Sequence, residues 1–229
     1  MIEAFVHFIR LHNISPKTIL DIGSRDLAQS VEFRRFFPYS RIIAFEPNPD
    51  QFNICNSISQ SAGIEFYPIA ISKLDCEVDF YAVDKNCKDP NIGASSLLSF
   101  SEDLHKQCIE RYGEMRVLAN KIKVKSRNLD NILKEISVSE AEVIWMDTQG
   151  LELEIIKSSP NTFSKTKIIH IESEFRTIYQ DQPLYPEVKA YLESTGFKEI
   201  YNRQPYKPEY KNFNDFNYPS DTDSIFVKI

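Results

Sequence analysis

The chain has 229 residues, of which 42% are hydrophobic and 26% charged, a composition that excludes a disordered chain and suits one α/β domain over residues 1–229. The net charge of −6 argues against a nucleic-acid partner, because phosphate backbones are bound by clustered Lys and Arg. The four cysteines form no C-x-x-C pair and have no histidine at metal-ligand spacing, which favours reduced thiols over a zinc site. No stretch has the length of a membrane span or the form of a signal peptide, so we expect a cytoplasmic protein.

Short strands and helices alternate along the chain. A leading helix within residues 1–16 should cover one edge of the sheet. Further helices are predicted over residues 27–37, 50–61, 102–112, 128–136, 151–157 and 185–195. Strands are predicted over residues 18–22, 41–45, 64–71, 78–83, 121–126, 142–147, 167–175, 197–201 and 224–229. Two long polar connections remain: residues 84–101, a candidate lid loop, and residues 201–223, which are rich in tyrosine.

This alternation predicts an α/β fold: a single Rossmann-like domain with a mostly parallel sheet of about seven strands, an antiparallel edge and helices on both faces. In such sheets, ligands bind outside the carboxyl ends of the strands. That rule places five segments on one rim: residues 21–26, 46, 70–72, 147–150 and 172–174. We therefore look for the functional site there.

The first strand and its turn indicate the kind of cofactor. Gly23 turns the chain sharply after the strand, and Glu46 ends the next strand, about 20 residues later, where a carboxylate can accept hydrogen bonds from both ribose hydroxyls. A nicotinamide-dependent oxidoreductase is disfavoured, because the single glycine leaves no G-x-G-x-x-G seat for a pyrophosphate. The acidic Asp21 and Asp26 instead suit a cationic cofactor without phosphate, such as S-adenosylmethionine.

Six motifs, taken in order, resemble those of the FkbM-type methyltransferases. They are ILDIGSRD, RIIAFEPNPDQF, YPIAIS, GASSL, VIWMDTQGLELEIIKSS and HIESEF, the last followed by YQDQPLYPEVKAYLESTGF. The resemblance spans residues 19–197 and implies a Rossmann-like methyltransferase domain that moves the methyl group of S-adenosylmethionine to a hydroxyl of a saccharide or polyketide-like small molecule. The chain departs from many members at Ser24, Arg25 and Asp26, where they have Ala-Asn and a second glycine, and at Gln149, where they have Glu.

The resemblance also implies roles for individual residues. The expected cofactor-binding residues are Asp21, Gly23, Ser24, Arg25, Glu46, Pro47, Ala70, Ile71 and Asp147, and Glu152 is the second acid of the fourth motif. The expected substrate-binding residues are Ser95, Ser96, Gln149 and Glu174. The match around residues 93–97 favours a lid over an ordinary connection for the loop 84–101.

Methyl transfer to an alcohol needs a general base, because a hydroxyl is a poor nucleophile until its proton is removed. The expected catalytic residues are Asp147, His170 and Glu172. His170 and Glu172 share one face of their strand with Glu174, although a single histidine within a strand is more often structural. Asp147, Glu172 and Glu174 could also hold a divalent metal such as Mg²⁺, but the sequence fixes no geometry for one and we predict no metal site.

Two other functions remain open at this point. One keeps the cofactor and changes the acceptor to an amine or a carboxylate of a small molecule. The other is a non-catalytic Rossmann-like domain that binds a partner through the tyrosine-rich segment 201–223, which could equally stack on a sugar or form the contact of a homodimer.

Overall fold

The computed structural model describes residues 1–207 and 219–229, and in this part of the chain seven strands form the main sheet. In spatial order they are β3 (Glu65–Tyr67), β2 (Arg41–Phe45), β1 (Thr18–Ile22), β7 (Val143–Met146), β8 (Ile168–Glu174), β10 (Asp221–Lys228) and β9 (Phe197–Asn202). All neighbours from β3 to β8 pair in parallel, and β10 is antiparallel to both β8 and β9. The predicted fold class is confirmed, with the antiparallel strand one position in from the edge.

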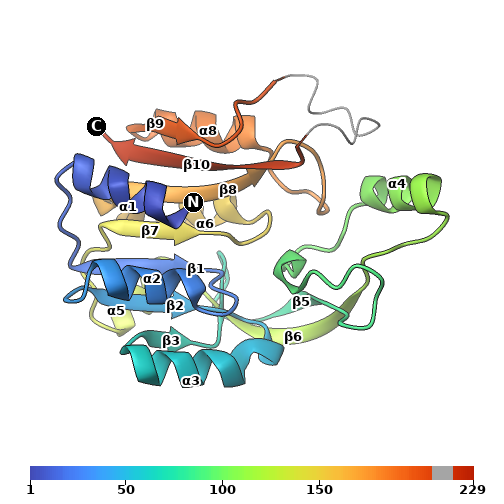
Figure 1. The fold of residues 1–229 in the computed structure, drawn as a ribbon, viewed down its shortest axis with the longest axis horizontal. Helices are drawn as coiled ribbons and strands as arrows, with labels where there is room; N and C mark the ends of the chain where they lie inside the picture. The colour runs from blue at the N-terminus through green and yellow to red at the C-terminus, as the bar shows by residue number, and fades with distance from the viewer. Residues whose placement is uncertain (208–218) are drawn as a thin grey trace.

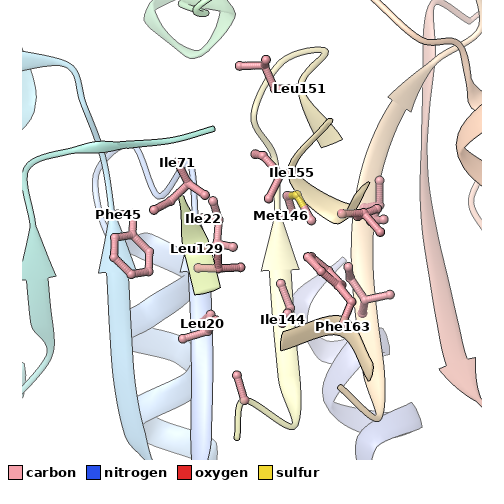
Figure 2. Close-up of a cluster of buried hydrophobic side chains, with 14 of the residues drawn as sticks. Leu20, Ile22, Phe45, Ile71, Leu129, Ile144, Met146, Leu151, Ile155 and Phe163 are labelled. Atoms are coloured by element: carbon pink, nitrogen blue, oxygen red, sulfur yellow. The ribbon is translucent and has the colours of Figure 1, made fainter. Parts of the chain in front are cut away.

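Helices cover both faces of this sheet (Figure 1). One face carries α1 (Ile2–Leu11), α2 (Ala28–Phe36) and α3 (Phe52–Ala62), and the other carries α5 (Leu129–Glu135), α6 (Glu152–Ser158), α7 (Pro160–Lys165) and α8 (Tyr185–Ser194). Alternation along β1 divides the core, because Ile19 packs with the first group while Leu20 and Ile22 pack with the second. Figure 2 shows the second cluster, which brings Leu20, Ile22 and Met146 of the strands together with Ile155 of α6.

The leading helix packs on a face of the sheet, so the expectation that it covers an edge was wrong. The ring of Phe5 in α1 lies 5.7 Å from Trp145 in β7 and 5.9 Å from His170 in β8, measured between centroids. These strands are at the centre of the sheet. Phe5, Val6 and Ile9 are buried there because an apolar stripe on a helix is stabilised by covering apolar side chains of the sheet.

The predicted strand over residues 64–71 is divided between two sheets. Its first half is β3, and its second half is β4 (Ala70–Ile71), which joins β6 (Ala119–Arg127) and β5 (Glu77–Val83) in a smaller sheet. Pro68 lies at the division, and a proline cannot donate to a sheet ladder. The helix α7 was not predicted, although Pro160 at its first turn is a common helix start.

The segment between β4 and α5 extends beyond the carboxyl ends of the main strands (Figure 1). It contains β5 and β6, paired antiparallel as predicted for residues 78–83, and the helix α4 (Glu102–Tyr112). The loop 84–101 lies within it and contains a short helix, η2 (Ile92–Ala94). This excursion therefore stands at the edge where the ligand rim was predicted. A second short helix, η1 (Pro49–Gln51), follows β2 at the same edge.

Gly23 should be far less tolerant of substitution than Gly63. Both have positive φ, +81° and +65°, but a Cβ at Gly23 would lie 1.8 Å from the carbonyl oxygen of Asp147, whereas nothing lies within 4 Å of one at Gly63. We expect Gly63→Ala to cost about 1–2 kcal/mol of unfolding free energy and Gly23→Ala to cost at least about 3 kcal/mol, measured by urea denaturation. Equal losses in the two variants would contradict the close approach.

Candidate functional site

A cavity that is partly open to solvent lies at the carboxyl ends of β1, β2 and β7. Ile22, Phe45 and Trp145 form its floor at the ends of these strands. Among the predicted cofactor-binding residues, those that line the cavity are Gly23, Arg25, Glu46, Pro47, Ala70, Ile71 and Asp147. Three predicted substrate-binding residues, Ser95, Ser96 and Gln149, line it as well.

The carboxyl group of Glu46 is held in place by two backbone amides. Arg25 N donates to Oε2 at 2.9 Å, and Asn48 N donates to Oε1 at 2.7 Å. Each carboxylate oxygen has a second lone pair, so Glu46 can still accept hydrogen bonds from a ligand. Burial raises the pKa of Glu46 to about 7, although the two amides oppose the shift.

The turn after β1 is fixed by the end of β2 and of β7. The amides of Gly23 and Ser24 both donate to the carbonyl of Phe45 at 3.0 Å, and Asp147 N donates to the carbonyl of Ile22 at 3.0 Å. Because Gly23 has no Cβ, the turn can lie directly against the backbone of Asp147. The predicted cofactor turn and the predicted catalytic acid are thus neighbours.

Asp147 belongs to a series of side-chain hydrogen bonds. Gln149 Nε2 donates to Asp147 Oδ1 at 2.6 Å, and Gln149 Oε1 accepts from the buried hydroxyl of Tyr179 at 2.6 Å. The Tyr179 hydroxyl also reaches the carbonyl of Ala94 at 3.0 Å. Within the described part of the chain, Asp147 Oδ2 accepts no hydrogen bond, so this oxygen is available to a ligand. Burial raises the pKa of Asp147 to about 7, with Glu152 adding to the shift.

The loop between β7 and α6 is shaped by Glu152, which is fully buried. One of its oxygens accepts from the Thr148 amide and hydroxyl, both at 2.8 Å, and the other accepts from the Gly150 amide at 3.1 Å. Gln149 has a φ of +56° in this loop, which turns its side chain back to Asp147. Glu152 therefore stabilises the loop through these hydrogen bonds. It does not line the cavity.

The inner end of the candidate lid loop is fastened to the cavity wall. Ser96 Oγ donates to the carbonyl of Gln149 at 2.8 Å, and Ser95 Oγ donates to the carbonyl of Ile92 at 2.8 Å and accepts from Val83 N at 3.0 Å. Both hydroxyls thus help to shape the cavity wall. Because both residues also line the cavity, their contact with a substrate stays a prediction.

Asp21 and Ser24 lie beneath the cavity and do not line it, contrary to the predicted cofactor contacts. Ser24 is buried, and its hydroxyl donates to the carbonyl of Phe45 at 3.3 Å. Asp21 is fully buried and accepts from the hydroxyl of Ser30 in α2 at 2.5 Å. Burial raises the pKa of Asp21 to about 7, although the hydrogen bond from Ser30 opposes the shift. Asp21 thus supports the turn from inside the protein.

His170 is a structural residue and lies away from the cavity, so the predicted catalytic role is withdrawn. It is 1% exposed, its ring stacks on Trp145 at 3.5 Å, and its Nε2 is 2.9 Å from Asp223 Oδ1. Burial lowers its pKa, although Asp223 opposes the shift. Phe5 of helix α1 packs against the ring on this face, and Trp145 stands between the ring and the cavity that it lines.

Glu172 and Glu174 also do not line the cavity. Glu172 is partly buried beside Asp223, its register partner in β10, and burial raises its pKa to about 9, with Asp147 adding to the shift. Glu174 is buried and accepts from Gln182 Nε2 at 2.9 Å. Within residues 1–207 and 219–229, no group of three or more His, Cys, Asp or Glu could hold a metal ion. The alternative of a metal bound by Asp147, Glu172 and Glu174 is therefore not supported.

Several cavity residues were missed by the sequence analysis. Gln29, Asn48 and Gln51 line it from the helices and turns that follow β1 and β2, and Phe80 and Leu97 line it from the excursion. Asn48 and Gln51 follow Glu46 closely, and polar residues just after a strand end were a usable signal. The contribution of Phe80 depends on the pairing of β5 with β6, which residue patterns alone do not bring over the main sheet.

Residues 208–218 of the tyrosine-rich segment 201–223 lie outside the part that the structure describes. The described Tyr206 packs against Phe175 and Tyr185, with ring centroids 5.4 and 5.9 Å apart. A role of this segment in binding a sugar or a second copy stays a prediction.

None of the helices in the described ranges has the length and apolar character needed to cross a membrane.

The sheet order and the cavity at the carboxyl ends of its strands define a Rossmann-like α/β protein. Residues 21–199 match the family described as Methyltransferase FkbM domain. The chain belongs to this family, and the predicted resemblance is confirmed.

The chain is also similar to individual proteins. The 2-O-methyltransferase NoeI of Sinorhizobium fredii is 29% identical over 170 residues, which are 73% of this chain and 65% of the relative, so the match spans just under two thirds of that protein. A solved fibrillarin/Nop5p complex has a TM-score of 0.50 and 13% identity over 94% of this chain and 74% of that one, a likeness of fold alone. Precorrin-6y C5,15-methyltransferase of Geobacter metallireducens has a TM-score of 0.47 and 13% identity, covering 99% and 86% of the two chains.

The buried carboxyl of Asp21 should make the protein less stable as the pH rises. The folded chain keeps the Asp21 proton up to about pH 7, whereas the unfolded chain loses it near pH 3.8, so the folded state binds more protons between these values. A shift of this size corresponds to at most about 4 kcal/mol. Between pH 5 and pH 7.5, we expect the unfolding free energy of Asp21→Asn to fall less than that of the wild type, as measured by urea denaturation.

The exposed Glu140 supplies the matched control. Glu140→Gln also removes one carboxylate but should keep the wild-type dependence on pH. Glu46 and Asp147 have raised pKa values too. The unfolding free energy of Asp21→Asn should therefore still fall with pH, but less steeply than that of the wild type. A slope in Asp21→Asn equal to that of the wild type would contradict the assignment.

Proposed function

We propose that the protein is an S-adenosylmethionine-dependent O-methyltransferase that acts on a hydroxyl of a saccharide or of a polyketide-like small molecule. The observation that carries the proposal is the cavity in which Glu46 and Asp147 lie on either side of the Gly23 turn, at the carboxyl edge of the sheet of an FkbM-family chain. The name of the relative NoeI, a 2-O-methyltransferase, favours a hydroxyl acceptor over an amine or a carboxylate.

The residues of the cavity fit this cofactor. Glu46 has free lone pairs for ribose hydroxyls, and Ala70 and Ile71 supply an apolar wall for an adenine ring. Burial raises the pKa values of both Glu46 and Asp147 to about 7, and Arg25 offsets only part of the shift at Asp147. A ligand with positive charge would stabilise both carboxylates.

When bound, S-adenosylmethionine supplies a methyl group on a positively charged sulfur, which an acceptor oxygen displaces in line. The chain must then hold the acceptor and accept its proton. Among the predicted bases, Asp147 alone lines the cavity, and its Oδ2 is free of other described contacts. A pKa near 7 suits a base that works at neutral pH, because the group is ionised often enough to act and still binds a proton well.

Gln149 and Tyr179 act as positioning residues for this base. The amide of Gln149 occupies Asp147 Oδ1, and Tyr179 fixes the amide orientation of Gln149 by donating to its oxygen. The same tyrosine hydroxyl reaches Ala94 in η2, so the base is braced by the inner end of the loop 84–101. This arrangement leaves Asp147 Oδ2 directed to other partners.

The test is a panel of acceptors scored by mass spectrometry for the gain of one methyl group. It should contain oligosaccharides with free hydroxyls, a polyhydroxylated polyketide, an amine and a carboxylic acid. We expect transfer to a hydroxyl acceptor, and Asp147→Asn should lower its rate about 10²–10⁴-fold while S-adenosylhomocysteine still binds, as measured by calorimetry. Glu140→Gln should react like the wild type.

Two outcomes would contradict the proposal. Transfer only to the amine or to the acid would change the class of acceptor. Full activity of Asp147→Asn would remove its role as the base and leave the family assignment unaffected.

A further inference from the structure

Arg25 places a positive charge in a cavity whose other charged groups are acidic. Glu46 and Asp147 line the same cavity. Arg25 lies in the turn after β1, which contacts both of them. A sulfonium cofactor alone would gain nothing from a cation here, because like charges repel. The arginine therefore needs a partner of its own within the ligand.

The backbone of Arg25 is held firmly from both sides. Its φ is +47°, its amide donates to Glu46 Oε2 at 2.9 Å, and its carbonyl accepts from Cys55 Sγ at 3.1 Å. The side chain thus starts one hydrogen bond away from the carboxyl proposed to hold the ribose. A ligand that contacts Glu46 must pass close to Arg25.

The guanidinium group of Arg25 is available for binding. Among the described residues its single ion-pair partner is Asp26, at 3.5 Å, and these two side chains are 52% and 35% exposed. Such a long, exposed pair contributes little and is easily exchanged. Arg25 Nη1 would lie 3.4 Å from a Cβ at Gly93, so the guanidinium faces the wall formed by η2.

The charge of Arg25 also reaches the proposed base. Arg25 is among the groups that act on Asp147, where it lowers the pKa against the larger effect of burial. The cavity thus contains a cation and an anion that interact electrostatically. A ligand that carries a carboxylate as well as a positive charge would match both signs of charge in this cavity.

We propose that Arg25 binds the α-carboxylate of the amino-acid end of the cofactor. This inference rests on the proposed function. It makes Arg25 the residue that distinguishes between adenosine thioethers: those with an α-amino acid group bind, and those without it bind weakly. The planar guanidinium suits this task, because it can donate two parallel hydrogen bonds to one carboxylate.

The experiment compares two ligands by calorimetry at pH 7.5: S-adenosylhomocysteine, which has the amino-acid end, and 5′-methylthioadenosine, which lacks it. Arg25→Gln should weaken binding of S-adenosylhomocysteine about tenfold or more and change that of 5′-methylthioadenosine less than about twofold. Arg25→Lys keeps the charge without the planar group and should lose less affinity. Arg35→Gln, an exposed residue of α2 with its side chain 73% exposed, should change neither. Unchanged thermal unfolding of the variants shows that they are folded.

The outcomes separate this inference from the proposed function. If the wild type binds S-adenosylhomocysteine and Arg25→Gln binds it equally well, Arg25 has no carboxylate to hold and the inference is wrong, although the proposed function stands. Equal weakening for both ligands also overturns it, since Arg25 would then support the nucleoside or the turn. Failure of the folded wild type to bind either ligand would contradict the proposed function itself.

Discussion

The close contact between Gly23 and Asp147 is the constraint on which the rest of the site depends. A side chain at position 23 would collide with the carbonyl of Asp147, and the amide of Asp147 continues the pairing of β7 with β1. The ends of two central strands are therefore locked together. This contact places the turn that carries Arg25 beside the loop that carries Gln149, so residues far apart in the chain form one cavity wall. Without it, the two acids would not share a ligand.

The second feature of the site is a pair of buried acids whose charge the protein compensates only in part. Burial removes water from Glu46 and Asp147 and raises their pKa values, and Arg25 offsets only part of the shift at Asp147. Keeping such groups costs stability near neutral pH, and functional sites are where proteins keep them. His170 is the opposite case. Its Nε2 pairs with Asp223 and its ring stacks on Trp145 inside the core, so it lies among structural partners and outside the cavity lining.

Much of the fold and of the site could be predicted from residue patterns, because parallel strands bring their carboxyl ends to one edge. Gly23, Glu46 and Asp147 follow directly from that rule. Glu172 and Glu174 were wrongly predicted to line the site, because the rule places a residue at the edge of the sheet but does not say where its side chain points. Their surroundings depend on β10, and Asp221, the partner of Glu174, lies 47 residues later in the chain. The break at Pro68 and the inward packing of Phe80 likewise depend on partners that are distant in sequence.

A crystal structure of the protein grown with S-adenosylhomocysteine tests the central claim most directly. The account predicts the nucleoside in the cavity at the ends of β1, β2 and β7, with the ribose hydroxyls within hydrogen-bond distance of the Glu46 carboxylate. It also predicts the sulfur beside the wall that carries Asp147. A nucleoside bound elsewhere, or one in this cavity with its ribose turned away from Glu46, would contradict it.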